Sequence, residues 1–237
     1  MSWRKVSAIA KKDLTHYFSS PMGYVVLAVF FLVTGFFFYL IAGKARMASM
    51  TPVFQNAIIL LLFLTPMITM RLWSEEEKSG TAELLKTSPI STWEVVLGKY
   101  LAVCAFGGVM LSVTLVYLLI MVEYGNPDMG PVLTCYIGFI LGVMAYFSLG
   151  LLASTFSENQ IISAVIAYGL LLMLWVIGAA GNNANGPIAK LLKYLSFFSH
   201  TSDFFNGVIN STHIVYFVSL IVAGLFFSVK VLESKRS

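Results

Sequence analysis

The sequence predicts an all-α integral membrane protein with six transmembrane helices. Of its 237 residues, 58% are hydrophobic and only 11% are charged, and the mean hydropathy is +0.85. A soluble domain carries about 25% charged residues. The apolar residues also gather into runs of about 20, the length that a helix needs to cross a hydrocarbon core about 30 Å thick. No polar stretch could form a second core, so we expect one membrane domain over 1–237.

The six apolar runs are the expected spans. Each must be helical, because backbone N–H and C=O groups in lipid have to pair within their own segment. In chain order we place them at 22–43, 52–70, 100–122, 132–153, 161–180 and 214–232.

The lysines and arginines predict the orientation, because they are enriched in cytoplasmic loops. With the N-terminus in the cytoplasm, eleven of them lie on the inner side and four on the outer side. We therefore expect both termini and the connection 71–99 to be cytoplasmic. The connection 181–213 is then the longest outer loop.

The segment 1–18 is expected to be an amphipathic helix at the membrane surface. At helical spacing, one face carries Trp3, Val6, Ile9, Ala10, Leu14 and Tyr17, and the other carries Arg4, Lys5, Lys11, Lys12 and Thr15. A basic amphipathic helix of this kind suits an anionic membrane surface. The alternative is a basic tail that only sets the topology.

The connection 71–99 begins with an acidic run that extends the second span. Arg71 and Glu75 are spaced for an i,i+4 ion pair, and Glu76 and Glu77 follow directly. Acids near a helix C-terminus oppose the helix dipole, so they add nothing to the stability of this helix. Gly80 suits a left-handed position after its last turn.

A short helix is expected next. Thr81 can cap its N-terminus, Glu83 lies in its first turn, and Pro89 ends it. Leu84 and Leu85 lie between these signals and could form an apolar docking surface. The alternative is a solvated loop whose charges only set the topology. After it, Ser91 and Glu94 form a capping box at the start of the helix that leads into the third span.

The outer connection 181–213 should hold short amphipathic helices. An apolar face is formed by Ile188, Leu191, Leu192, Leu195 and Phe198, with Pro187 in the first turn. A second short helix is expected from Asp203. The three histidines, His16, His200 and His213, are scattered along the chain and indicate no metal site.

Several classes of activity are disfavoured. Apart from Glu123 and Lys230 near the membrane ends, the spans carry no ionisable acid, base or histidine, which argues against an ion-coupled carrier or a channel. The chain also lacks the G-x-x-x-x-G-K-[ST] motif of a phosphate-binding loop, so it cannot hydrolyse ATP through one. We expect no catalytic residue, no metal, no cofactor in this chain and no nucleic-acid partner.

One stretch resembles a known family. MRLWSEEEKSGTAELLKTSPISTWEVVLGKYLA is similar to the cytoplasmic loop of type-2 ABC transporter permeases, where E-E-x-x-x-G-T-x-E-L-L-x-x-x-P-I precedes a helix ending in G-K. The stretch FSSPMGYVV, the YGNP turn at 124–127 and the ending FFNGVINSTHIVYFVSLIVAGLFFSVKVLESKR fit the same family. The resemblance covers essentially the whole chain and is closest to the gliding-motility-associated branch.

The resemblance implies that 71–99 holds a coupling helix, which inserts into a groove on a separate cytoplasmic ATPase subunit. On this reading the acids meet basic or polar groups of the ATPase, the Gly-Thr pair makes the turn, and the Leu pair is the apolar anchor. The implied interface comprises Glu75, Glu76, Glu77, Gly80, Thr81, Glu83, Leu84, Leu85 and Pro89. The N-terminal helix would touch the ATPase as well as lipid, and the outer helices would be re-entrant.

The resemblance also implies a function. The chain would be the permease subunit of an ABC transporter in the bacterial cytoplasmic (inner) membrane, paired with a second permease as a homodimer or heterodimer. ATP and Mg would be bound by the ATPase, whose hydrolysis would drive export or mechanical work transmitted through the membrane. An auxiliary or periplasmic subunit is a further candidate partner. The alternative is a non-transporting scaffold or regulatory subunit with the same fold.

Overall fold

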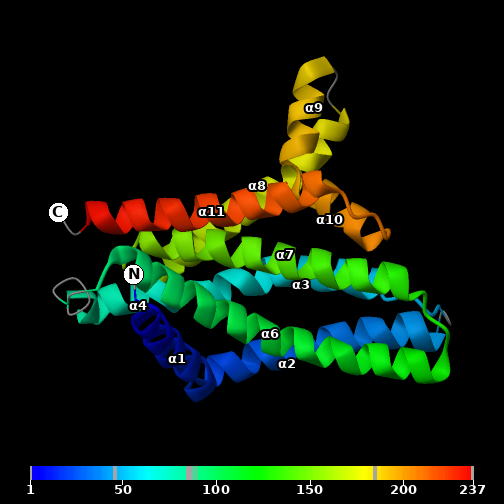
Figure 1. The fold of residues 1–237 in the computed structure, drawn as a ribbon, viewed down its shortest axis with the longest axis horizontal. Coiled ribbons are helices and arrows are strands. Elements are labelled where there is room, and N and C mark those ends of the chain that lie inside the picture. The colour runs from blue at the N-terminus through cyan, green and yellow to red at the C-terminus, as the bar shows by residue number, and fades with distance from the viewer. Residues whose placement is uncertain (1, 45–46, 84–87, 89, 184–185, 236–237) are drawn as a thin grey trace.

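A computed structural model describes residues 2–44, 47–83, 88, 90–183 and 186–235. The regular structure of these residues is entirely helical, and six of the helices are long and apolar enough to cross a membrane. Each expected run lies within one of these helices, whose ends extend beyond it. The predicted all-helical membrane fold class is therefore confirmed to this extent (Figure 1).

Up to Tyr124, the described residues form five α-helices, one π-helical segment and a short helical stretch at 81–83. The α-helices and the π-helical segment are α1 (Trp3–Ser19), α2 (Pro21–Phe38), its π-helical continuation η1 (Tyr39–Lys44), α3 (Thr51–Thr69), α4 (Arg71–Lys78) and α6 (Thr92–Tyr124). Ser20 caps α2, with Pro21 in its first turn, where the missing N–H costs nothing. α4 follows α3 after the single turn residue Met70, so the second span and the acidic run form one nearly continuous helix.

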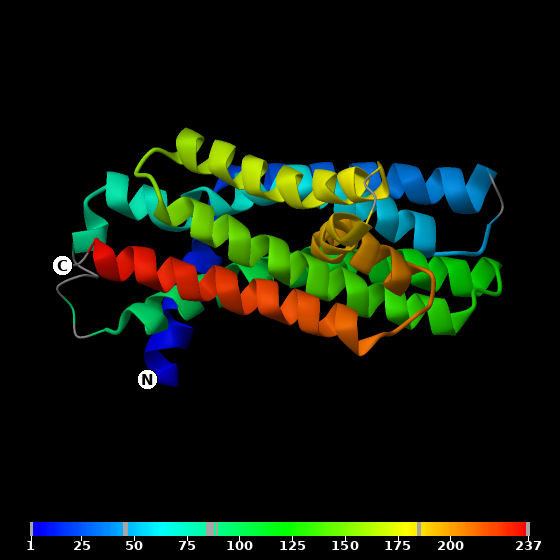
Figure 2. The same cartoon turned by 90° about the horizontal axis from the view of Figure 1, so that it is seen from above.

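The second half contains α7 (Met129–Thr155), α8 (Gln160–Asn183), α9 (Gly186–Leu195), α10 (Phe197–Phe205) and α11 (Ser211–Ser234). Both termini lie at one end of the bundle, together with α4, and we call this the terminal end (Figure 1). The α6–α7 connection lies at the opposite end, as Figure 2 shows from above.

α3 and α7 form the centre of the bundle, because most of their length is buried, whereas α2 and α8 bury far less of theirs. Aromatic rings fill the space beside α7: Tyr146 stacks on Phe197 with ring centroids 4.2 Å apart. α6 is the longest helix among the described residues, with 33 residues, and it contacts α7 near its middle. A β-carbon at Gly107 would lie 2.6 Å from the ring of Phe147, so only glycine allows this approach.

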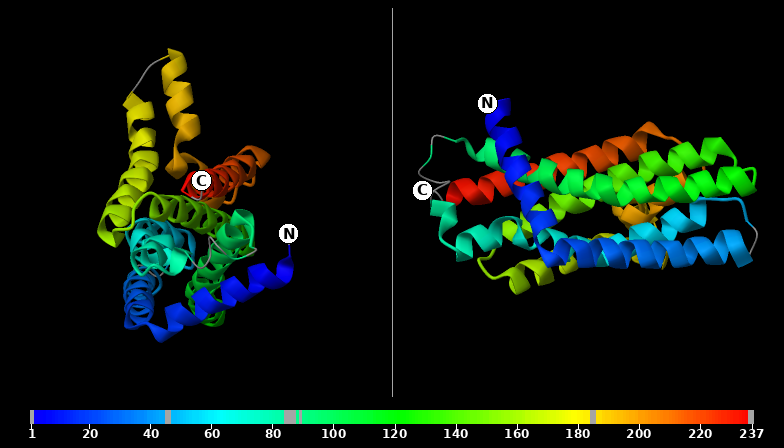
Figure 3. Two further views of the ribbon diagram at one scale, coloured as in Figure 1. Left: turned by 90° about the vertical axis from the view of Figure 1, so that its left-hand side faces the viewer. Right: turned by 90° about the horizontal axis from the view of Figure 1, so that it is seen from below.

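α1 crosses the terminal end at a steep angle to the spans (Figure 3, right). Its apolar face is divided: Val6 is fully buried, whereas Trp3 is 71% exposed. α1 packs on α6 at Gly98, where a β-carbon would lie 2.8 Å from the Ile9 side chain. The apolar face that we expected to meet the membrane therefore packs largely on protein.

The helices of the connection 181–213 differ from the expectation in two respects. The second one begins at Phe197 rather than at Asp203, because the Ser196 side chain caps it by accepting the N–H of Ser199. Phe198 consequently belongs to this second helix and does not extend the apolar face of α9. α9 itself begins at Gly186 and lies beside α8, which also packs on α3 and α7, and α9 projects away from the rest of the bundle (Figure 3, left).

Candidate functional site

The acidic run lies on α4 at the terminal end, and each of its glutamates faces a different part of the chain. Glu75 Oε2 lies 3.8 Å from His16 Nε2 of α1. Glu76 meets Lys12 of α1 and Lys99 of α6. Glu77 accepts two hydrogen bonds from Lys235, directly after α11, the shorter of them 2.8 Å long. Three consecutive residues thus connect α4 to α1, α6 and the end of α11.

Lys12, Asp13, Glu76 and Lys99 form a compact group that we call the charged cluster. Lys99 Nζ lies 2.8 Å from Glu76 Oε2 and 3.2 Å from Asp13 Oδ2, and Lys12 Nζ lies 2.7 Å from Glu76 Oε1. The side chain of Lys99 is only 2% exposed, and Nζ also lies 5.9 Å from the centroid of the Trp73 ring. Two bases and two acids leave the cluster neutral, which is the condition for burying such charges.

Lys12 is the exposed member of the charged cluster, because 62% of its side chain is accessible. Partial burial opposes its charge, but the hydrogen bond and the charge of Glu76 outweigh this effect and raise the pKa of Lys12 above its ordinary value. Its charge is therefore retained throughout the physiological range.

Sequence reasoning did not identify Asp13 and Lys99. Asp13 is the single acid among the first 21 residues, and Lys99 directly precedes an apolar run. Either position could have been noted as unusual. Their pairing joins residues 86 positions apart and required the fold.

The structure agrees with some of the helix boundaries that the sequence predicted after the acidic run. Gly80 has a φ of +74°, as the predicted left-handed position requires. The Thr81 hydroxyl donates to the carbonyl of Glu76 and lies 2.9 Å from the Ser79 hydroxyl, so it closes the end of α4, whereas the helix that Thr81 was predicted to cap extends beyond the described residues. Residues 81–83 are helical and Glu83 is exposed. Leu84, Leu85 and Pro89 lie outside the described residues.

The predicted pair of Arg71 and Glu75 does not form. Among the described residues, the hydrogen-bond partner of Arg71 is Ser20, with Nη1 3.5 Å from Oγ. Its Nε atom is buried and has no partner there. Glu75 turns instead toward His16 of α1.

The capping box at the start of α6 is confirmed. Glu94 accepts the N–H of Ser91 at 3.0 Å, and the Ser91 hydroxyl accepts the N–H of Glu94 at 3.2 Å. The same carboxylate also accepts the backbone N–H of Ser2, directly before α1. One side chain therefore caps α6 and holds the start of α1 against it.

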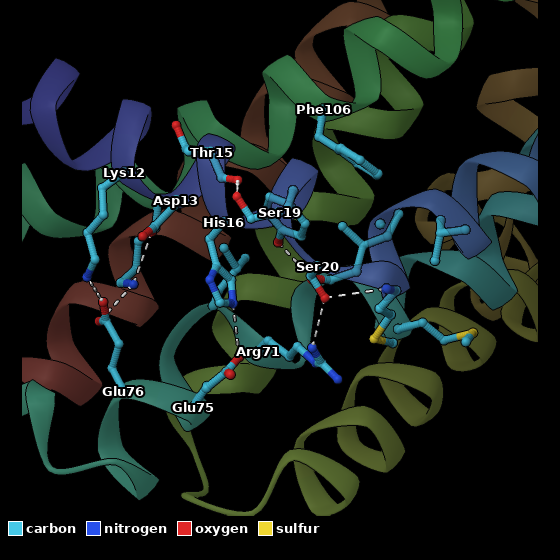
Figure 4. Close-up of a pocket in the computed structure, with 18 of the residues that line it drawn as sticks. Lys12, Asp13, Thr15, His16, Ser19, Ser20, Arg71, Glu75, Glu76 and Phe106 are labelled. Carbon is cyan, nitrogen blue, oxygen red and sulfur yellow. Dashed lines mark hydrogen bonds and ion pairs between the residues drawn. The ribbon is translucent and has the colours of Figure 1, made fainter.

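A cavity of about 490 Å³ lies beside the charged cluster, among α1, α2, α3, α4 and α6. Arg71, His16, Glu75 and Ser20 lie together on one side of it, and the charged cluster lies on another (Figure 4). The wall also includes small polar residues, namely Thr15, Ser19, Ser79 and Thr81, and apolar side chains, namely Tyr17, Met22, Val26, Met67, Ile68, Leu72 and Phe106. Burial raises the pKa of Tyr17, whose hydroxyl donates to the carbonyl of Ile68 at 2.8 Å.

A second polar group lies between α9, α10 and α11, and we call His200, Asp203 and His213 the histidine cluster. The Nδ1 atoms of the two histidines are 2.6 Å apart. His213 Nε2 lies 2.9 Å from Asp203 Oδ2, and His200 Nε2 lies 2.8 Å from the carbonyl oxygen of Tyr194. The interpretation that the histidines are scattered is therefore wrong for this pair. Among the described residues, no group of three or more His, Cys, Asp and Glu could hold a metal ion.

Proton counting defines the charge of the histidine cluster. The Asp203 carboxylate and the Tyr194 carbonyl only accept hydrogen bonds, so each Nε2 must carry a proton. A third proton must lie between the two Nδ1 atoms. Three ring protons on two imidazoles give the pair one positive charge, which the carboxylate of Asp203 balances. Burial lowers the pKa of His200, which favours the neutral form of this ring.

Six membrane-spanning helices with an ion-paired terminal end define a multi-pass membrane protein. The model of one family, the ABC-2 family transporter proteins, matches residues 7–232, and the chain belongs to that family. No curated protein matches the chain. The chain is thus the permease membrane subunit of an ABC-2 transporter, a family that has no ATPase domain of its own and works with an ABC ATPase subunit.

Proposed function

We propose that the chain converts movement of a partner ATPase into movement of its spans, either to export a cargo or to transmit mechanical work across the membrane. The observation that carries this proposal is the position of α4. It continues the second span, and its three consecutive glutamates contact α1, α6 and the residue directly after α11.

The geometry of a helix explains why these contacts could transmit a displacement. Successive residues are about 100° apart around the axis, so three in a row face three directions. A shift of α4 would pull on three neighbours at once instead of bending a single loop. The ion pair with Lys99 is buried, so moving Glu76 away would leave charge without its partner, at a large cost.

The ATPase contact is best assigned to the residues after α4. The side chains of Glu76 and Glu77 are mostly buried, whereas Gly80, Thr81 and Glu83 are exposed. We propose that Leu84 and Leu85 are the apolar anchor, that Gly80 and Thr81 set the turn before it, and that Pro89 ends the coupling helix. Glu75, 37% exposed, is the member of the acidic run best placed to meet the ATPase directly.

The remaining partners follow from the same hypothesis. The proposed site of action is the bacterial cytoplasmic membrane, with both termini and the 71–99 connection in the cytoplasm. A second permease copy or a sister permease would complete the assembly, ATP and Mg would bind the ATPase, and an auxiliary subunit could join outside. The gliding-motility-associated branch remains our proposal for the closest relatives.

Copurification with an ATPase tests the coupling proposal. Replacing Leu84 and Leu85 with Asp should place charge in a partly apolar contact and abolish both ATPase binding and stimulated hydrolysis. Val208 and Ile209, exposed at 52% and 53%, provide the matched control, and the same double replacement there should leave both intact. Full binding of the ATPase by the Leu84/Leu85 variant would overturn the proposal that these residues are the apolar anchor. A rate of ATP hydrolysis that changes when a cargo is added would favour export. A rate that no added cargo changes would favour the scaffold alternative.

Cysteine labelling tests the proposed orientation. Single cysteines at Ser79 and Asp128, both exposed, are introduced after Cys104 and Cys135 are replaced with Ser. A membrane-impermeant reagent added to sealed cells should modify position 128 and not position 79. Labelling of position 79 instead would reverse the assigned topology.

A further inference from the structure

The cavity beside the charged cluster contains a cationic group whose hydrogen-bonding capacity is not used. A guanidinium has five N–H donors, and a buried donor without an acceptor destabilises the fold. Nε of Arg71 is buried without a partner among the described residues, and Nη1 reaches only the Ser20 hydroxyl at 3.5 Å. The site therefore lacks an acceptor beside Arg71.

The acids around the cavity do not supply that acceptor. Asp13 and Glu76 are held by Lys99 and Lys12. Glu75 lies 3.8 Å from His16, and no ion pair within 4 Å joins it to Arg71 in the described part of the chain. In Figure 4 the Arg71 side chain lies on the side of the cavity away from the charged cluster. An anion from outside the chain is the group that would complete its hydrogen bonds.

The volume and lining of the cavity favour an organic anion over a small free anion. Its volume of about 490 Å³ is that of a site for an organic ligand. Most of the wall is apolar, with Met22 and Val26 from α2, Met67 from α3 and Phe106 from α6. A ligand that fills it must combine one anionic group with an apolar body.

The position of the cavity in the fold identifies the source of such a ligand. It lies at the terminal end, between the ends of membrane-spanning helices and α1, which crosses them. Phosphate groups and the first part of the acyl chains meet at this level of a bilayer. The exposed bases Arg4 and Lys11 on α1 would favour an anionic surface there.

We propose that this cavity is a binding site for an anionic phospholipid. Its phosphate accepts hydrogen bonds from the Arg71 guanidinium and the Ser20 hydroxyl, a geometry for which arginine is well suited. Its apolar part lies along Met22, Val26, Met67 and Phe106. The bound lipid joins α1 to α2, α3 and α4, and thus belongs to the same end of the molecule as the acidic run. The site does not depend on the proposed transport function.

Lipid titration of the purified chain tests this assignment. The chain is delipidated in detergent and titrated with phosphatidylglycerol, phosphatidylcholine or glycerol 3-phosphate, while bound lipid is counted by native mass spectrometry. One phosphatidylglycerol should bind per chain with saturation, at least about tenfold more tightly than phosphatidylcholine, and glycerol 3-phosphate should not compete. Equal binding of the two lipids, or competition by glycerol 3-phosphate, would overturn the proposal.

Substitutions assign the effect to Arg71. Arg71→Gln should weaken phosphatidylglycerol binding at least about tenfold, and Arg71→Lys should weaken it less, because the charge remains without the planar donor pair. Lys230→Gln is the matched control, since it removes a charge near the same end from a side chain that is 58% exposed. Unchanged binding by Arg71→Gln would refute the site.

A measurement on the unmodified chain covers the case in which Arg71→Gln does not fold. Phosphatidylglycerol with a photoactivatable diazirine in one acyl chain is added, irradiated and mapped by peptide mass spectrometry. Crosslinks should concentrate on peptides that contain Met22, Val26 or Met67, and excess unlabelled phosphatidylglycerol should remove them. Crosslinks spread evenly over the exposed faces of α2 and α8 would refute the proposal.

Discussion

The charged cluster and the histidine cluster connect helices in different ways. The charged cluster uses lysines and carboxylates, whose charges do not change near neutral pH. The histidine cluster uses two imidazoles, whose hydrogen bonds depend on holding three ring protons. The first should therefore connect α1, α4 and α6 under all physiological conditions, whereas the second should connect α9, α10 and α11 only over a limited pH range. A permanent connection suits the end that we propose to receive force.

The largest effect is expected from removing the buried lysine of the charged cluster. Lys99→Met would leave Asp13 and Glu76 buried without their shared cation, which typically costs about 3–5 kcal/mol. Thermal unfolding in detergent should show a large loss of stability. Lys12→Met is the control: its side chain is 62% exposed, so its loss should cost under about 1 kcal/mol. Equal effects of the two substitutions would contradict the distinct role of Lys99.

Acidification should weaken the histidine cluster next. Burial lowers the folded-state pKa of His200, so its stabilising contribution is present above the unfolded pKa of about 6.5 and is lost as the pH falls below it. A fourth proton would place two N–H groups face to face across 2.6 Å. The groups around His200 that set this response are Tyr194, Asp203, His213 and Tyr216.

Hydrogen exchange measures this pH response. After correction for intrinsic rates, amides of α10 should exchange faster at about pH 5 than at about pH 7.5. The free energy of opening should fall by the contribution of about one hydrogen bond, roughly 0.5–1.5 kcal/mol. His200→Phe should remove the difference, and amides of α6 near the charged cluster should not show it. An α10 that exchanges equally at both pH values would show that the three-proton arrangement is wrong.

A smaller effect is expected at the shared cap of α1 and α6. Ser91→Ala removes the cap of α6 alone and should cost about 1 kcal/mol. Glu94→Ala removes the return bond to Ser91 and the acceptor for the N–H of Ser2, so amides at the start of α1 should also exchange faster. If the two variants affect α1 equally, Glu94 does not hold α1 in place.

The smallest effect should follow from Glu77→Gln. Its partner Lys235 lies after the last turn of α11, and Gln keeps an acceptor for its ammonium group, so the substitution should cost under about 1 kcal/mol although Glu77 is only 11% exposed. ATPase stimulation should nevertheless decrease if α4 transmits movement to α11. Lys230→Gln, which breaks a pair within α11, is the matched control and should leave stimulation unchanged.

Local signals explain what could be predicted from the sequence. The six apolar runs, the left-handed Gly80 and the Ser91–Glu94 capping box each depend on residues within a few positions of one another. The Lys12–Glu76, Asp13–Lys99 and Glu77–Lys235 pairs join residues 64 to 158 positions apart, and no local pattern contains them. Three consecutive acids predicted an exposed surface, but the side chains of Glu76 and Glu77 are mostly buried. The histidine pair was missed because the helix break falls at Ser196. His200 therefore lies on α10, a helix that we expected to begin only at Asp203.

The length of α6 has a mechanical consequence. At 33 residues and about 1.5 Å per residue it is a rod about 50 Å long, some 20 Å longer than the hydrocarbon core is thick. Its N-terminal part carries the cap at Glu94 and the buried Lys99, and it meets α7 at Gly107, near its midpoint. A tilt of such a rod by about 5° about its midpoint would move each end by about 2 Å in opposite directions. A push on the end that carries Glu94 would then reappear, reversed, at Tyr124 at the opposite end of the bundle.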